Sequence, residues 1–95
     1  MMDLYERFEK FNEEFIKFDR IKNKRSLKRD MHAFLLLEEL FPESKERMVS
    51  AASHDVIYLG IEEDMLKKLT DDNIIELTRC GIIYDKENDC LYTFT

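Results

Sequence analysis

The chain has 95 residues, of which 44% are hydrophobic and 12% aromatic, which is enough for one packed core and argues against wholesale disorder. Only two glycines and one proline occur, which excludes collagen-like, linker-rich and low-complexity architectures and favours long helices. The formal net charge is −6 at pH 7, and residues 61–95 hold nine Asp or Glu against four Lys or Arg. We expect a single domain over residues 1–95 with an acidic C-terminal third.

Residues 2–24 are predicted to form one long amphipathic helix. Large apolar residues recur along it at spacings of four and three, which places them on one side of a helix. We name these residues the N-terminal stripe: Leu4, Phe8, Phe11, Phe15 and Phe18. In a chain this small, the stripe packs either on the rest of the domain or on a second copy of itself. We expect a homodimer that uses the N-terminal stripe at least in part, with residues 1–25 as the dimerisation element.

A second helix is predicted over residues 26–41, with Ser26 as its N-terminal cap and Pro42 ending it. Its central run, Ala33–Leu37, leaves no polar side for more than a turn, so we expect this helix to be surrounded by protein. Residues 43–52 are predicted to form a short third helix, because Pro42 suits a first helical turn.

The pattern changes to β-prone residues after His54. Residues 56–59 are predicted to form a strand, and residues 62–69 a short helix with an acidic first turn. Thr70 then caps another helix whose first turn is again acidic.

The chain is predicted to end in a hairpin. Gly81 fits the left-handed position that follows a helix. Residues 82–85 and 90–94 then pair across residues 86–89, where Asn88 tolerates a left-handed turn conformation.

The predicted order from residue 26 is helix, short helix, strand, helix, helix, strand, strand. This order, with the Leu77–Gly81–Ile83 junction before the hairpin, resembles a winged helix-turn-helix. The sequence therefore predicts an α+β fold in which a helical N-terminal half precedes a winged-helix-like core over residues 26–95. The core is expected to hold a small three-stranded antiparallel sheet with two short helices between its first and second strands.

Cations gather where the first two predicted helices meet. This basic segment, residues 20–29, consists of Arg20, Lys22, Lys24, Arg25, Lys28 and Arg29. It is either a solvated helix end or a contact for a small anion or a nucleic acid. The helix that would read DNA carries Asp71, Asp72 and Glu76, and a duplex repels each carboxylate there.

No constellation in the sequence predicts catalysis. Ser50, Ser53, His54 and Asp55 include a nucleophile, a base and an acid, but close neighbours in sequence rarely converge as a triad. No nucleophile elbow or glycine-lined oxyanion loop accompanies them. His32 lies on the second helix and is expected to be a structural histidine. We therefore expect a protein that is not an enzyme.

The two cysteines indicate a reducing compartment. Cys80 and Cys90 lack the spacing of a zinc site, and charges from Asp3 to Lys10 interrupt any signal-peptide core before them. No apolar run approaches the ~18 residues that a membrane span needs. We expect a cytoplasmic protein with no metal, no cofactor and no membrane partner.

The acids of the C-terminal third open two predicted helices and line the hairpin tip. We name them the acidic set: Glu62, Glu63, Asp64, Asp71, Asp72, Asp85, Glu87 and Asp89. If these elements pack side by side, the carboxylates form one face that complements a basic partner. Helix-dipole and turn preferences at the same positions explain part of the pattern without any partner.

The ending Cys-Gly-Ile-Ile-Tyr-Asp, followed by Asp-Cys-Leu-Tyr-Thr-Phe, resembles small acidic proteins of bacteriophages and prophages. The resemblance implies a stoichiometric inhibitor of the anti-CRISPR kind, whose acidic surface occupies the nucleic-acid site of a host protein. Our leading hypothesis is a non-enzymatic protein-binding module in the host cytoplasm that acts through the acidic set. Two alternatives stay open: a winged-helix DNA-binding regulator that uses the basic segment, and an assembly protein that oligomerises through the N-terminal stripe.

Overall fold

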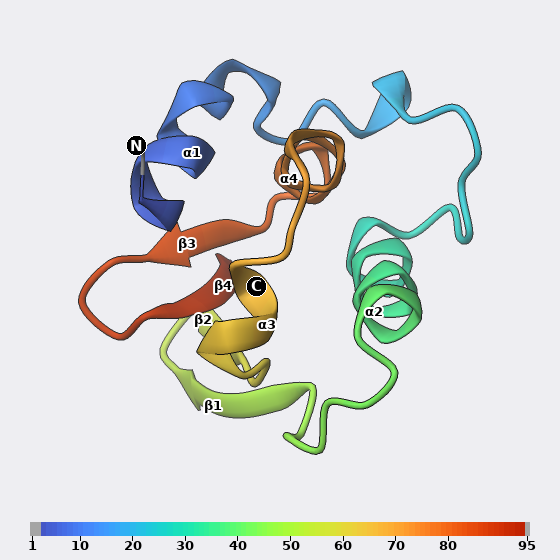
Figure 1. Cartoon of the computed structure of the whole chain (residues 1–95). Helices are drawn as coiled ribbons and strands as arrows, with labels where there is room; N and C mark the ends of the chain where they lie inside the picture. The colour runs from blue at the N-terminus through green and yellow to red at the C-terminus, as the bar shows by residue number, and fades with distance from the viewer. Residues whose placement is uncertain (1–2, 95) are drawn as a thin grey trace.

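The computed structural model describes residues 3–94, which form helices and one β-sheet (Figure 1). The helical elements are α1 (Leu4–Lys10), the 3-10 helices η1 (Asn12–Glu14) and η2 (Phe18–Arg20), α2 (Arg29–Leu40), α3 (Glu63–Leu66) and α4 (Asp71–Arg79). The strands are β1 (Val49–Ser53), β2 (Val56–Leu59), β3 (Ile83–Asp85) and β4 (Cys90–Phe94). The predicted α+β class is confirmed.

The four strands form one antiparallel sheet in the order β1-β2-β4-β3. The predicted count of three strands is too low, and the helix predicted over residues 43–52 is wrong. Strand β1 lies there instead and pairs with β2 across a two-residue turn, in which His54 has a φ of 54°. A positive φ at that turn position is what tight hairpins require. Because this extra strand follows α2 directly, the winged-helix order is not confirmed.

The long N-terminal helix predicted over residues 2–24 is also wrong. Helix α1 begins with a capping box between Asp3 and Glu6 and ends at Lys10. Two 3-10 turns follow, and Ile16 takes a φ of 61°, which a helix does not allow. The Ile16 amide donates to the carbonyl of Thr78 on α4, so a long-range contact bends the chain. Met2 lies outside the described residues.

Helix α2 begins later than predicted. Ser26 does not cap it: its hydroxyl accepts the amide of Lys28, which is itself the residue before the helix. The helix ends at Leu40, ahead of Pro42, as predicted. Its expected burial on all sides is wrong, because the side chains of Met31 and Leu35 are 46% and 41% exposed.

The predictions for residues 70–94 are confirmed except at one turn position. Thr70 caps α4 and forms a capping box with Asn73, and Gly81 has a φ of 88°. Strands β3 and β4 form the predicted hairpin, but the left-handed residue in its turn is Asp89, with a φ of 50°, and not Asn88.

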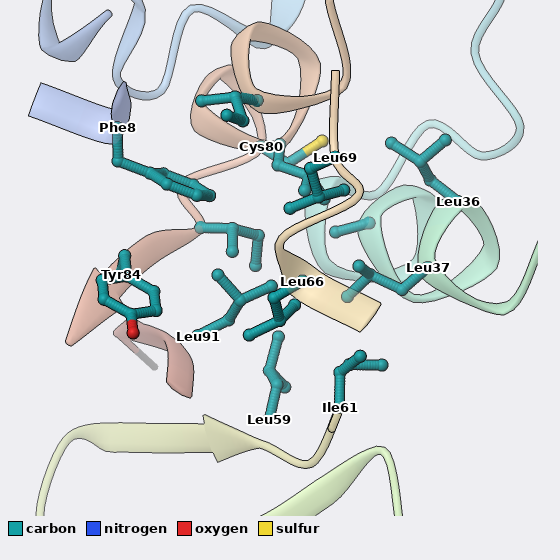
Figure 2. Close-up of a cluster of buried hydrophobic side chains, with 14 of the residues drawn as sticks. Phe8, Leu36, Leu37, Leu59, Ile61, Leu66, Leu69, Cys80, Tyr84 and Leu91 are labelled. Atoms are coloured by element: carbon teal, nitrogen blue, oxygen red, sulfur yellow. The ribbon is translucent and has the colours of Figure 1, made fainter. Parts of the chain in front are cut away.

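The core lies between one face of the sheet and the surrounding helices (Figure 2). Aliphatic side chains dominate it, and the largest of those that are fully buried are Leu37, Leu59, Leu66, Ile74, Leu77, Ile82 and Leu91. Phe8 of α1 completes the core beside β3, where its ring stacks on Tyr84 at a centroid distance of 6.1 Å. The core therefore lies on a single face of the sheet.

Candidate functional site

The strand register divides the sheet side chains between two faces. Leu59, Leu91 and Tyr84 lie opposite one another on β2, β4 and β3, and all three are buried in the core. Successive strand residues point to opposite faces, so the neighbours Tyr58, Tyr92 and the residues in line with them face away from the core. The sheet thus has a second face, which points away from the core.

This second face is apolar and largely aromatic. We name it the open sheet face, and it consists of Val56, Tyr58, Ile83, Tyr92 and Phe94. Within residues 3–94, none of the five belongs to the core cluster or to the half-buried hydrophobic side chains packed against it. Phe94 is 56% exposed. The other four are half-buried, and α1 borders the face at Ile83 and Phe94. The face therefore lies outside the core, with Phe94 as its most exposed ring.

The aromatic rings of the open sheet face contact one another. The ring centroids of Tyr58 and Tyr92 are 6.3 Å apart across neighbouring strands, and those of Tyr92 and Phe94 are 5.6 Å apart in an edge-to-face arrangement. Both distances lie in the range of favourable aromatic pairs. The three rings therefore form one preorganised patch rather than isolated exposed side chains.

Two hollows extend the apolar surface at the end of the sheet, and Phe15 and Phe94 line both of them. The first, of about 370 Å³, lies between α1 and the β3–β4 hairpin and is also lined by Tyr5 and Ile83. Because Ile83 and Phe94 belong to the open sheet face, this hollow continues that face toward α1.

The second hollow, of about 700 Å³, lies between the start of α2 and the sheet. Ile16, Phe34, Val49 and Ile57 contribute its apolar lining, and Arg29 lies at its edge. Ile16 and Val49 are 47% and 41% exposed. Ile57 and Thr93 are in line with Leu59 and Leu91, so this hollow lies on the core side of the sheet and meets the open sheet face only at Phe94.

Charge on the sheet is negative and sparse. Asp85 is the one charged residue within the four strands, which otherwise read Val-Ser-Ala-Ala-Ser, Val-Ile-Tyr-Leu, Ile-Tyr and Cys-Leu-Tyr-Thr-Phe. Glu9 of α1 lines the first hollow. Burial, and then the nearby Asp85, Tyr58 and Glu9, raise the pKa of Tyr92. The open sheet face thus combines aromatic rings with carboxylates and carries no cation of its own.

The acidic set mostly has local partners. Asp71 pairs with Arg7 at 3.1 Å, and Glu63 lies 3.8 Å from the Lys67 ammonium group. Glu62 accepts the Ser44 hydroxyl and the Lys45 amide, and the Ser44 contact holds the pKa of Glu62 below its ordinary value.

The hairpin members of the acidic set shape their own turn. Asp85 accepts the amides of Glu87 and Asn88 and the Asn88 side-chain amide, and these bonds hold its pKa below the ordinary value. Asp89 accepts the hydroxyl of Tyr84 at 3.0 Å. Helix-terminus and turn roles therefore account for much of the acidic pattern in the sequence.

Part of the acidic set does converge. A hollow of about 880 Å³ beside α1 brings Glu63, Asp71 and Asp89 together, but Arg7, Lys67 and Lys86 line it too. Its charge is therefore mixed. Within the described part of the chain, three exposed members of the set have neither an ion pair nor a hydrogen bond to the carboxylate: Asp64, Asp72 and Glu87.

The basic segment does not form a single cationic surface. Arg20 pairs with Glu14, Arg25 bridges Glu39 and Glu76, and Lys24 donates to the Ile21 carbonyl. The remaining members, Lys22, Lys28 and Arg29, are exposed. Half of the segment therefore serves internal contacts.

Because α1 ends at Lys10, the members of the N-terminal stripe do not lie along one helix. Phe8 is buried in the core, and Leu4, Phe11 and Phe18 pack against it. Phe15 is 36% exposed and lines both hollows at the end of the sheet, whereas Phe8 lines only the first. The homodimer stays a prediction.

His32 is fully buried and holds three segments together. Its Nδ1 accepts the Arg25 amide at 2.9 Å, so the neutral ring carries its proton on Nε2, which donates to Glu76 at 2.7 Å. His54 lies in the exposed β1–β2 turn. Burial raises the pKa of the Cys80 thiol to about 12. Cys80 and Cys90 are free thiols.

The residues described here contain no group of three or more His, Cys, Asp or Glu placed to hold a metal ion. No helix within residues 3–94 is both long enough and apolar enough to cross a membrane. No family model, curated protein or solved structure matches the chain.

The open sheet face was not among the sites predicted from the sequence. Its signal is present in β4, where Leu91 and Thr93 alternate with Tyr92 and Phe94, so that large side chains occupy both faces of one strand. Such a strand needs cover on two sides, and this chain covers one.

Proposed function

We propose that this chain is a non-enzymatic protein-binding module that engages a partner protein through its open sheet face. The observation that carries the proposal is the cluster formed by Tyr58, Tyr92 and Phe94, which lies outside the core and ends in the exposed ring of Phe94. Tyrosine and phenylalanine are enriched at the centres of protein interfaces. A contiguous exposed apolar patch is a common mark of an interaction surface.

The partner that fits best is a basic protein. The chain carries a net charge of −6, and its four strands carry one charge, on Asp85. This supports the sequence-based hypothesis of a phage-type inhibitor that occupies the nucleic-acid site of a host protein. In this proposal the open sheet face makes the central contact, and the exposed acids Asp64, Asp72 and Glu87 attract the partner from the rim.

A DNA-binding regulator is supported less well. Helix α4, which would be the recognition helix, buries Ile74 and Leu77, and its Arg79 is held by Glu14 at 2.8 Å. A helix that reads base edges needs free donors and cations on its outer side. This alternative predicts salt-dependent binding to random duplex DNA, whereas the protein-binding module should show none.

The test uses a double variant, Tyr92→Asp with Phe94→Asp, and a control, Leu35→Asp. Leu35 is 41% exposed on α2, so the control adds the same kind of charge to an apolar side chain outside the open sheet face. With the tagged parent chain, host proteins are captured and the specific partner is purified. We expect the double variant to lose that partner and the control to keep it.

Thermal unfolding of all three chains checks that the fold is retained. Should the fold of the double variant fail, the milder Tyr92→Ser, whose truncated side chain keeps a hydroxyl, replaces it. A partner that binds the folded face variant as tightly as the parent would contradict the proposed function.

A further inference from the structure

The open sheet face has a chemical character beyond being apolar. It places the rings of Tyr58, Tyr92 and Phe94 in one patch, with Asp85 on the same strand face two residues after Ile83. Glu9 approaches from α1 and lines the adjoining hollow. Aromatic rings beside carboxylates form the environment that binds a cationic side chain, since the ring faces and the carboxylates both attract positive charge.

The chain's own cations show that aromatic rings here attract positive charge. Within residues 3–94, Lys10 lies over the Phe11 ring, Lys24 over Phe18 and Lys86 over Tyr5, at 5.1 to 5.3 Å from the ring centroids. None of these three contacts involves a ring of the open sheet face. Those rings are therefore available to a cation from outside.

Resting on the proposed function, we infer that the open sheet face recognises an arginine-containing basic segment of the partner protein. A guanidinium group stacks flat on an aromatic ring and can still donate to a carboxylate beside that ring. Within residues 3–94, Asp85 Oδ1 accepts two turn amides, whereas Oδ2 accepts only the Asn88 side-chain amide and has room for one further donor. The pairing of Tyr58 with Tyr92 supplies the rings, and Asp85 supplies a carboxylate on the same face. A lysine lacks the planar group that uses both features together.

The alternative occupants fit this surface less well. A single-stranded nucleic acid also stacks its bases on aromatic rings, but it needs cations beside its phosphates. The strands provide Asp85 and no Lys or Arg. A neutral apolar segment would use the rings but would gain nothing from the negative charge of Asp85 and Glu9, which the turn and Asn12 contacts leave in place.

The test measures binding of defined probes to the full chain at physiological ionic strength by calorimetry and by NMR shifts. The probes are peptides with four Arg-Gly-Gly repeats, four Lys-Gly-Gly repeats and four Ser-Gly-Gly repeats, and a twelve-residue oligothymidine. We expect the arginine peptide to bind at least about threefold more tightly than the lysine peptide and to shift Tyr58 and Tyr92 signals. The neutral peptide and the oligonucleotide should bind far more weakly.

Two matched variants separate recognition of the arginine peptide by Asp85 from the effect of the chain's overall charge. Asp85→Asn and Asp72→Asn remove the same charge, but Asp85 lies on the open sheet face and Asp72 lies exposed on α4. We expect Asp85→Asn to weaken the arginine peptide about fivefold and Asp72→Asn to change it less than about twofold. Tyr92→Leu, which keeps an apolar side chain but removes the ring, should weaken it about tenfold.

The inference would be overturned if Asp85→Asn and Asp72→Asn lowered the affinity for the arginine peptide equally. It would also be overturned if the arginine and neutral peptides bound equally well. The proposed function would survive that outcome if the Tyr92→Asp, Phe94→Asp double variant still lost its partner. Tighter binding of the oligonucleotide than of any peptide would overturn both.

Discussion

The two faces of one sheet follow different rules in this protein. The inner face presents Leu59, Leu91 and Tyr84 to helices that bury them, whereas the outer face presents Tyr58, Tyr92 and Phe94, which lie outside the core and are bordered only by α1 within residues 3–94. The inner face is mainly aliphatic and the outer face mainly aromatic. Aliphatic side chains serve tight packing, while aromatic side chains combine apolar area with rings that accept varied partners. The difference suggests that stability lies on one face and recognition on the other.

The largest effect expected from this comparison concerns stability. Leu91→Ala leaves a cavity in a fully buried position and should lower the free energy of unfolding by about 2–5 kcal/mol. Phe94→Ala truncates a side chain on the outer face of the same strand. It should lower the free energy of unfolding by less than about 1 kcal/mol, because the ring is 56% exposed. Urea unfolding of both variants measures the contrast. Equal losses would show that the outer face is also part of the folding core.

A buried polar network gives the next largest effect. His32→Leu removes the bond to Glu76 and leaves the Arg25 amide without its acceptor, so it should cost about 1–3 kcal/mol. The outward-facing Tyr58→Phe, which also deletes one polar group, should cost close to nothing. Urea unfolding compares the two, and a cost for Tyr58→Phe equal to that of His32→Leu would contradict the division between the faces.

Alkaline pH distinguishes the two faces through their tyrosines. Burial, and then the bond to Asp89, raise the pKa of the inner Tyr84 above its ordinary value of 10.0. Because the pKa is higher in the folded state than in the unfolded state, the contribution of Tyr84 is complete below pH 10. It is lost as the pH rises above 10.

Tyr84→Phe should therefore cost about 1 kcal/mol at neutral pH and lessen the loss of stability above pH 10. Tyr92→Phe, on the outer face, should have a smaller effect on that loss because water screens a surface group. Unfolding curves between pH 8 and 11 measure both slopes. If the free energy of unfolding of Tyr84→Phe fell with pH as steeply as that of the parent, the Tyr84 hydroxyl would not be the cause of the alkaline loss of stability.

Local signals were sufficient to predict the second half of the fold. The cap at Thr70, the glycine after α4 and the β-prone runs around the last turn each specify their own conformation within a few residues. The strand at residues 56–59 was predicted for the same reason. Only the left-handed turn residue was misplaced, by one position, from Asp89 to Asn88.

The first half was predicted less well because contacts distant in sequence determine it. The spacing of the N-terminal stripe is helical, yet the bond from the Ile16 amide to the Thr78 carbonyl bends the chain, and Phe8 enters the core. Strand β1 is rich in Ser and Ala, which have little strand preference of their own. Its conformation comes from pairing with β2, which no local sequence pattern predicts.

The open sheet face could likewise be predicted only in part from local sequence patterns. Alternation in residues 91–94 indicates a strand with large side chains on both faces. Which face is left uncovered depends on where α2, α3 and α4 dock, and that is a property of the assembled core. The acidic set was visible in the sequence, but the roles of Asp71, Asp85 and Asp89 in local bonds became evident only from their partners.

The smallest effect on the fold, and a decisive one for function, concerns the exposed acids. Asp72→Lys with Glu87→Lys should lower the free energy of unfolding by about 1 kcal/mol or less, because neither carboxylate has an ion pair within residues 3–94 and only Asp72 favours the helix dipole at the start of α4. Binding of a basic partner should weaken about fivefold to tenfold, since like charges would then face each other. The parent's affinity should also fall with added salt, which screens exposed charges beyond ~8 Å at physiological ionic strength.

The control for this change is Glu38→Lys with Glu43→Lys, which reverses two exposed acids on and just after α2. Both double variants alter the net charge equally, so any difference between them reports where the partner sits. Equal losses would mean that overall charge alone attracts the partner. If neither variant nor salt changed the affinity, the acidic set would be a solvated surface, and recognition would lie entirely with the aromatic rings of the open sheet face.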